Sequence, residues 1–196
     1  MSTRTDSMPV TQAVHDLGSA LWFGGATMGV IGVNSAGRDL EQGVDRIRVA
    51  SSAWRRFGLL EWAGIGATLI AGAQLTRSSR RRIGLQQGYG TVGGVKAGLA
   101  VAGALATGYA AYCGMRIGAE AERARREEEP IEVTDATTPN SRTPARIAKW
   151  QRRQRIAQYA VPLLAGANIA AGSKLVQSYR PIESSKGVLK RIIPGL

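Results

Sequence analysis

Residues 17–37 read LGSALWFGGATMGVIGVNSAG, a run of 21 residues without a charged side chain. Three similar stretches follow: 20 residues at 57–76, in which Glu61 is the single charge, 19 at 97–115 and 18 at 156–173. About 20 helical residues cross a bilayer core that is about 30 Å thick. Helices of water-soluble proteins rarely run so far without a charge on their outer face. The four uncharged stretches therefore predict an all-α integral membrane bundle of four transmembrane helices with amphipathic surface helices.

The rest of the chain is strongly basic. Lys and Arg number 26 against 14 Asp and Glu, which gives a formal net charge of +12 in 196 residues. These cations lie beside apolar stretches and lack interleaved aromatic residues, so we expect anionic lipid headgroups as their partners and no nucleic acid. One Cys and one His exclude an internal disulfide framework and a His-rich metal site. No cluster of His, Cys or carboxylates suggests catalysis, so we predict no enzyme activity, no cofactor and no metal.

Small residues recur four positions apart in the uncharged stretches. Such spacing lets helix backbones approach closely where apolar burial gives no net drive in lipid. The expected packing positions are Gly25, Gly29, Ala63, Ala67, Ala71, Gly98, Ala102, Ala106, Gly166 and Ala170. We expect these faces to pack against one another, against other membrane protein subunits or against a second copy of the chain.

Charge and composition divide the chain into five segments. Residues 1–13 are expected to form a flexible N-terminus, and 14–116 the first three spans with basic connectors. Residues 117–155 form a charged connector outside the membrane. The fourth span covers 156–176, and 177–196 form a basic amphipathic tail whose cations suit an anionic membrane surface.

Two connectors carry further predictions. The apolar spacing within 38–56 predicts an amphipathic helix that lies on the membrane surface or against a partner. Residues 130–144 are rich in Thr, Pro and Asn and are expected to be mobile. Connectors 38–56 and 116–155 hold 15 Lys and Arg against 11 elsewhere, which favours placing them in the cytoplasm. The acid-free run RSSRRR at 77–82 favours the opposite orientation.

Four polar residues are candidates for function. His15 and Asp16 begin the first span, where they could transfer protons or could simply cap the helix. Glu61 lies one turn inside the second span, where an acid is costly and often functional, although a helix N-terminus also favours it. Asn168 lies near the middle of the fourth span, and its amide is expected to bond another helix.

Residues 14–36, VHDLGSALWFGGATMGVIGVNSA, resemble the opening of small multi-pass membrane proteins of actinobacteria that lack an assigned function. The resemblance implies a four-span architecture in the plasma membrane and supplies no catalytic residue. We expect a non-catalytic accessory or scaffold subunit of a larger plasma-membrane complex, respiratory or cell-envelope in kind. The alternative is a small transporter or channel in which Glu61 and Asn168 are the working residues.

Overall fold

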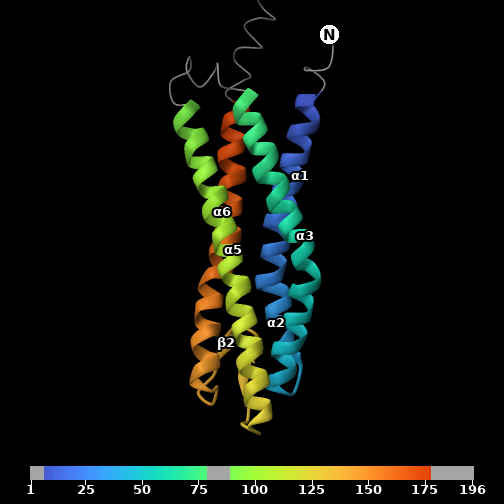
Figure 1. Ribbon diagram of the computed structural model, residues 1–196, viewed down its shortest axis with the longest axis vertical. Helices are drawn as coiled ribbons and strands as arrows, with labels where there is room; N and C mark the ends of the chain where they lie inside the picture. Colours follow the sequence, from blue (N-terminus) through green and yellow to red (C-terminus); the bar gives the residue numbers. More distant parts are fainter. Residues whose placement is uncertain (1–6, 79–88, 178–196) are drawn as a thin grey trace, which may run out of the picture.

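The computed structural model describes residues 7–78 and 89–177, and these residues are mostly helical (Figure 1). The long helices, in chain order, are α1 (Ser7–Met28), α3 (Gly43–Ser78), α5 (Tyr89–Arg126) and α6 (Ala145–Gln177). The prediction of an all-α fold is therefore confirmed.

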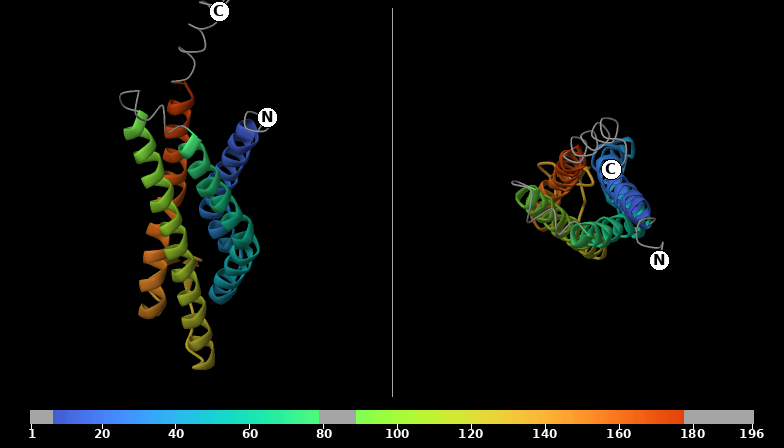
Figure 2. Two further views of the ribbon diagram at one scale, coloured as in Figure 1. Left: turned by 45° about the horizontal axis from the view of Figure 1, so that its top comes forward. Right: turned by 90° about the horizontal axis from the view of Figure 1, so that it is seen from above.

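The four helices form one elongated bundle in which successive helices run in opposite directions (Figure 1). α1 packs mainly against α3, and α5 packs mainly against α6. Seen along the bundle axis, these two pairs lie on opposite sides (Figure 2). The links α1–α3 and α5–α6 lie at the same end, which we call the hairpin end and define as residues 37–48 and 120–147.

α1 continues toward the hairpin end through three short elements. A π-helical turn (Gly29–Val33) leads into α2 (Asn34–Ala36) and then into a 3₁₀ turn (Gly37–Asp39). A π-helical turn widens the helix by one residue, and such turns are frequent at functional sites. The first uncharged stretch is thus irregular in its second half.

The connector between α5 and α6 contains a small antiparallel hairpin. Strand β1 (Val133–Asp135) pairs with β2 (Thr138–Pro139), and the pairs are Val133 with Pro139 and Asp135 with Thr138. We expected 130–144 to be mobile, and the structure instead buries Val133 and Asp135. Arg46 of α3 holds the hairpin, because its Nη1 donates to the Val133 carbonyl over 2.7 Å.

Two apolar clusters form the core at different levels of the bundle. The upper cluster contains Trp22, Ala26, Ile65, Val161 and Ala165. The lower cluster, nearer the hairpin end, contains Ile47, Ile117, Ala121, Ala124, Val133 and Ile147. Both clusters draw residues from both helix pairs, so each of them joins the pairs together.

The lower cluster corrects the prediction of an amphipathic surface helix in connector 38–56. α3 begins at Gly43 and is continuous with the second uncharged stretch, so residues 43–56 run along the bundle axis and form no separate surface helix. The apolar side of this segment faces the bundle, where Ile47 and Ala50 are each 3% exposed.

The structure describes only part of the two predicted terminal segments, 1–13 and 177–196. α1 begins at Ser7, so residues 7–13, which we expected to be flexible, are helical. Residues 1–6 and most of the predicted amphipathic tail at 177–196 lie outside the described residues.

The helices approach closely at glycines, but only some of these were predicted. A Cβ on Gly25 would meet the Phe57 ring, and one on Gly29 would meet the Trp54 ring. The backbones of α1 and α3 also approach closely at Gly18 and Gly64, which were not predicted from the sequence. A Cβ on Gly18 would lie 2.8 Å from the Gly64 carbonyl oxygen.

The remaining predicted packing positions divide into two groups. Ala71 is buried, Ala67 would be met by a Cβ on Gly18, Ala106 packs on the upper cluster and Gly166 faces Phe23. In contrast, the exposed positions are Ala63, Gly98, Ala102 and Ala170. On α5 the helix turns other small residues, Ala100 and Gly103, toward the interior, because a shift of one residue rotates a helical face by about 100°.

One helix of the described residues, Gly90–Arg126, is long and apolar enough to cross a membrane by length and composition. The other described helices do not meet the same criterion. The stretch of α3 contains Glu61 and Gln74 and that of α6 contains Gln158 and Asn168, and these polar side chains lower the hydropathy. The first stretch is divided at Met28 between α1 and the π-helical turn.

Candidate functional site

A cavity of about 450 Å³ lies inside the bundle between the two apolar clusters. Ala26 and Val161 of the upper cluster line one end, and Ile47 and Ile117 of the lower cluster line the other. Its volume falls within the range of about 300–1,000 Å³ that is usual for small-molecule sites.

Glu61 of α3 lines this cavity and is 5% exposed. Within residues 7–78 and 89–177 its carboxyl group makes no hydrogen bond and no ion pair. The nearest cations in the sequence, Arg55 and Arg56, are both exposed. A buried carboxyl group without a partner is costly, since its charge is removed from water without compensation. The predicted functional acid is therefore a buried group that faces an internal space.

A network of amide groups lies on the same cavity wall. Trp54 Nε1 donates to Asn34 Oδ1 over 2.9 Å, and Asn34 Nδ2 donates to Gln158 Oε1 over 2.7 Å. Gln154, one turn before Gln158 on α6, donates from Nε2 to the Ala110 carbonyl over 3.4 Å. All of these residues line the cavity. The Asn34 bonds join α2, α3 and α6, and the separate Gln154 bond joins α5 to α6.

Asn34, Gln154 and Gln158 were not predicted from the sequence. A sequence pattern on α6 could have predicted the two glutamines. Gln151, Gln154 and Gln158 follow helical spacing, and all three are buried. Most of the residues between them, such as Arg155, are exposed, and Ala157 is buried. A polar stripe on the inner face of a helix thus marks the cavity level.

Two breaks in regular helix geometry flank the cavity. The π-helical turn of 29–33 ends at Asn34, which is a cavity residue. Pro162 lies within α6, next to the cavity residue Val161. Because proline has no N–H, the carbonyl of Gln158, four residues earlier, loses its helical hydrogen bond. Pro162 therefore leaves a polar backbone group near this level of the bundle.

The cavity has an opening between α3 and α5. Its exposed lining residues come from these two helices and are Ser51, Arg55, Trp62, Ala111 and Met115. Because α1 packs on α3 and α5 packs on α6, this opening lies at a seam between the two helix pairs.

His15 and Asp16 belong to a separate polar group nearer the other end of the bundle. Lys96 Nζ lies 2.6 Å from His15 Nε2, and His15 Nδ1 lies 3.0 Å from Asp16 Oδ1. None of these three residues lines the cavity. The structure therefore brings His15 and Asp16 together with Lys96, and it separates them from Glu61.

Between these two sites, buried hydroxyls connect the helices. Ser19 Oγ lies 3.2 Å from Thr68 Oγ1, and Trp22 Nε1 donates to Thr107 Oγ1 over 3.3 Å. Asn168 is completely buried, yet within the described residues neither of its amide atoms has a hydrogen-bond partner. The expected bond from Asn168 to another helix is thus not formed with any residue of 7–78 or 89–177.

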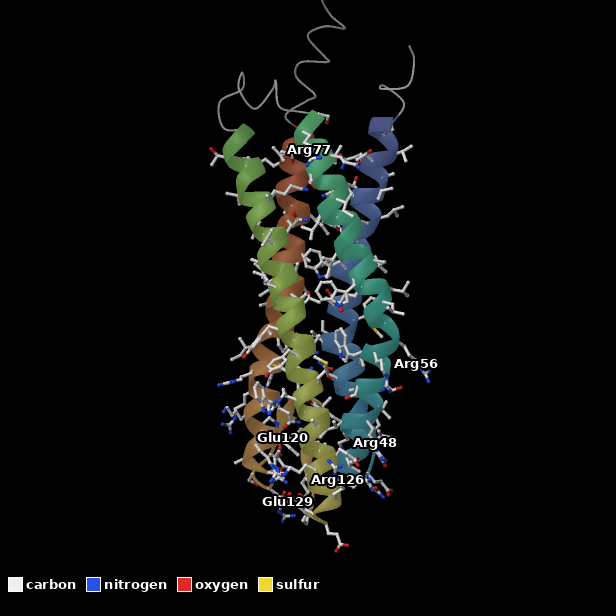
Figure 3. The ribbon with its side chains drawn as sticks, viewed as in Figure 1. Arg48, Arg56, Arg77, Glu120, Arg126 and Glu129 are labelled. Atoms are coloured by element: carbon white, nitrogen blue, oxygen red, sulfur yellow. The ribbon has the colours of Figure 1, made fainter. Side chains whose placement is uncertain are left out.

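The hairpin end is densely charged. Figure 3 shows Arg48, Glu120, Arg126 and Glu129 at this end of the bundle, with Arg77 at the opposite end. Arg146 is central here: its side chain forms ion pairs with Glu120, Glu127 and Glu129. Among the described residues, no group of three or more His, Cys, Asp and Glu side chains could hold a metal ion.

Comparison of the chain with protein-family models, curated proteins and solved structures gave no match. The cavity with its unpaired carboxyl group is therefore the feature from which a function can be inferred.

Proposed function

We propose that the chain is a multi-pass plasma-membrane protein whose four helices each cross the bilayer. The distribution of side chains supports this topology. Large apolar side chains are exposed on every long helix, namely Leu17, Leu59, Leu105 and Leu163. Polar side chains are buried on the same helices, namely His15, Glu61, Thr107 and Asn168. Water-soluble bundles have the opposite distribution, whereas polar groups inside membranes face the bundle interior.

The lengths of the uncharged stretches agree with this topology. They contain between 18 and 21 residues, or about 27–32 Å of helix, against a bilayer core of about 30 Å. α5 has 38 residues, so about 27 Å of it would extend beyond the bilayer core. We propose that the hairpin end faces the cytoplasm, because connectors 38–56 and 116–155 carry most of the Lys and Arg.

Within this bundle we propose that the cavity binds a small ligand, as in a small transporter or channel. The observation that carries the proposal is Glu61, a buried carboxyl group without a partner among the described residues that lines a cavity of about 450 Å³. Membrane proteins keep buried ionisable groups mainly where they contact a substrate, an ion or a proton path. Of the two functions expected from the sequence, the cavity favours the second.

A pair of glycines on α3 provides a matched test. A Cβ on Gly58 or on Gly66 would meet nothing within 4 Å, but only Gly58 lines the cavity. Full-length protein in lipid nanodiscs would be screened against small amines, alcohols and carboxylates by ligand-observed NMR. We expect at least one class to bind the wild type and Gly66→Leu but not Gly58→Leu. Equal binding to all three proteins, or none to any of them, would contradict a ligand site in the cavity.

We also propose a second function, an accessory subunit of a larger membrane complex. The outward positions of Gly98 and Ala102 on α5 support it, because this small-residue face is exposed in the bundle and would allow close approach of another helix. A tagged pull-down from native membranes in mild detergent tests it. Reproducible co-purification of the same membrane subunits with wild type, but not with Gly98→Leu, is the expected result. Elution of the wild type by itself or as a homo-oligomer would exclude the larger complex.

A further inference from the structure

Glu61 is the one carboxylate among the described residues that line the cavity. The single cation in that lining, Arg55, is exposed, and no ion pair joins it to Glu61. The interior of the cavity is therefore negative when Glu61 is ionised. A ligand that brings a positive charge would compensate the buried carboxylate, whereas an anion would add a second uncompensated charge.

The remaining walls suit an apolar body attached to that charge. Most of the lining is apolar, including Ile47, Met115 and Val161. The indole rings of Trp54 and Trp62 also line the cavity, and aromatic faces attract ammonium groups. Gln154 offers a further acceptor, because its Nε2 donates to Ala110 and no described residue donates to its Oε1. An ammonium group has N–H donors for both Glu61 and Gln154.

The opening gives the direction from which such a ligand would enter. It lies between α3 and α5, where Trp62, Ala111 and Met115 are exposed and apolar, and Arg55 is the charged residue beside them. In the proposed membrane topology this seam faces lipid close to the boundary with the headgroups. Molecules that concentrate at this depth are amphiphilic, with a polar group at the surface and an apolar chain in the hydrocarbon.

From this placement we propose that the cavity binds an amphiphilic monovalent cation, with its ammonium group at Glu61 and its apolar chain directed to the α3–α5 opening. The proposal rests on the proposed ligand-binding function and specifies the chemical class of the ligand. It assigns Glu61 to charge selection and the tryptophans and aliphatic residues to binding of the apolar part.

The test uses three probes of the same chain length and different charge: hexylammonium, 1-hexanol and hexanoate. Their binding to full-length protein in phosphatidylcholine nanodiscs would be measured by calorimetry, with empty nanodiscs as the blank. For the wild type we expect hexylammonium to bind at least about tenfold more tightly than 1-hexanol, and hexanoate to bind more weakly than both. A tenfold ratio corresponds to one good charge interaction that the alcohol cannot make.

Glu61→Gln should remove the preference for hexylammonium and leave 1-hexanol binding unchanged, because the cavity keeps its size. Glu41→Gln is the matched control, since Glu41 is an exposed carboxylate at the hairpin end and does not line this cavity. It should retain the preference. Glu61→Asp keeps the charge and should retain part of the preference, and thermal unfolding would check that all variants are folded.

The outcomes separate this inference from the function on which it rests. If 1-hexanol and hexylammonium bind equally to wild type and Glu61→Gln, and Gly58→Leu abolishes both, the cavity binds ligands but the inferred charge selection is wrong. Tighter binding of hexanoate would overturn the inference and indicate that Arg55 governs selection. If Gly58→Leu weakens the binding of none of the three probes, the proposed ligand-binding function itself is wrong.

Discussion

Arg38 Nη2 donates to Asp135 Oδ2 over 2.8 Å, and Arg38 Nε donates to the same oxygen over 3.1 Å. Arg38 follows α1, whereas Asp135 belongs to the hairpin between α5 and α6, so this pair links the two halves of the chain. The carboxylate is almost completely buried, and its other oxygen accepts from the backbone N–H of Thr137 over 2.9 Å. Both carboxylate oxygens therefore have donors.

Asp135→Asn should destabilise the hairpin end. The asparagine amide has one acceptor oxygen, so it cannot accept from both Arg38 and the Thr137 N–H. It also lacks the charge that strengthens the bonds from Arg38. Hydrogen bonds to charged groups are worth about 1.5–3 kcal/mol, and we expect a loss of that order in the free energy of unfolding. Thermal or denaturant unfolding in detergent would measure it. Glu132→Gln is the control, because Glu132 pairs with Arg142 on an exposed surface and should cost less than about 1 kcal/mol.

The same residue predicts a dependence of stability on pH. Burial by itself would raise the pKa of Asp135, but the hydrogen bonds from Arg38 and Thr137 outweigh it and hold the pKa below its usual value. A carboxyl group with a lowered pKa stabilises the fold above the pKa of the unfolded chain, about 3.9. This contribution should be lost as the pH falls through the lower pKa of the folded state. Unfolding curves between neutral pH and pH 2 would show a smaller acid-induced loss for Asp135→Asn than for wild type.

Gly18→Ala should weaken the packing of α1 on α3. The new Cβ would lie 2.8 Å from both the Ala67 Cβ and the Gly64 carbonyl oxygen, so the two helices would have to separate. Overpacking of this kind costs about 1–3 kcal/mol. Gly98→Ala is the matched helical control, because a Cβ there meets nothing within 4 Å. It should be neutral or stabilise by up to about 1 kcal/mol through helix propensity. Equal melting temperatures for the two variants would show that the close approach is not needed.

Two buried asparagines should respond differently to replacement by Leu. Asn168→Leu removes amide atoms that have no partner among the described residues, so stability should be unchanged or higher. Asn34→Leu leaves Trp54 Nε1 and Gln158 Oε1 without their partner, at about 1–3 kcal/mol for each group. Chemical unfolding of both variants would test this order. A larger loss for Asn168→Leu would mean that its amide is bonded after all.

The sequence predicted the helices well because a run without charge is a direct signal of a long buried or lipid-facing helix. It predicted their ends less well. Ile47 and Ile117 lie in charged segments, and only their contact across the lower cluster shows that α3 and α5 continue as one bundle. The hairpin was missed because its burial depends on contacts from distant residues, such as the hydrogen bond from Arg46 to Val133.

The site was predicted in part. An acid in an uncharged stretch is conspicuous, so Glu61 was found from the sequence. The amides Asn34 and Gln158 were not, because an amide carries no charge and their pairing spans 124 positions of the chain. The sequence left open whether Gly98 and Ala102 face the bundle interior or a partner, because spacing defines a stripe on a helix but not the direction in which the stripe points. The structure leaves both positions exposed.

The unbroken length of α5 has a mechanical consequence. With 38 residues it is a rod about 57 Å long, and neither proline nor a π-helical turn interrupts it. A rod that pivots at one end by 5° moves its far end by about 5 Å, given that length. Glu120, which pairs with Arg146, and Met115, which lines the cavity opening, lie on this one rod, so a tilt of α5 would move both residues together.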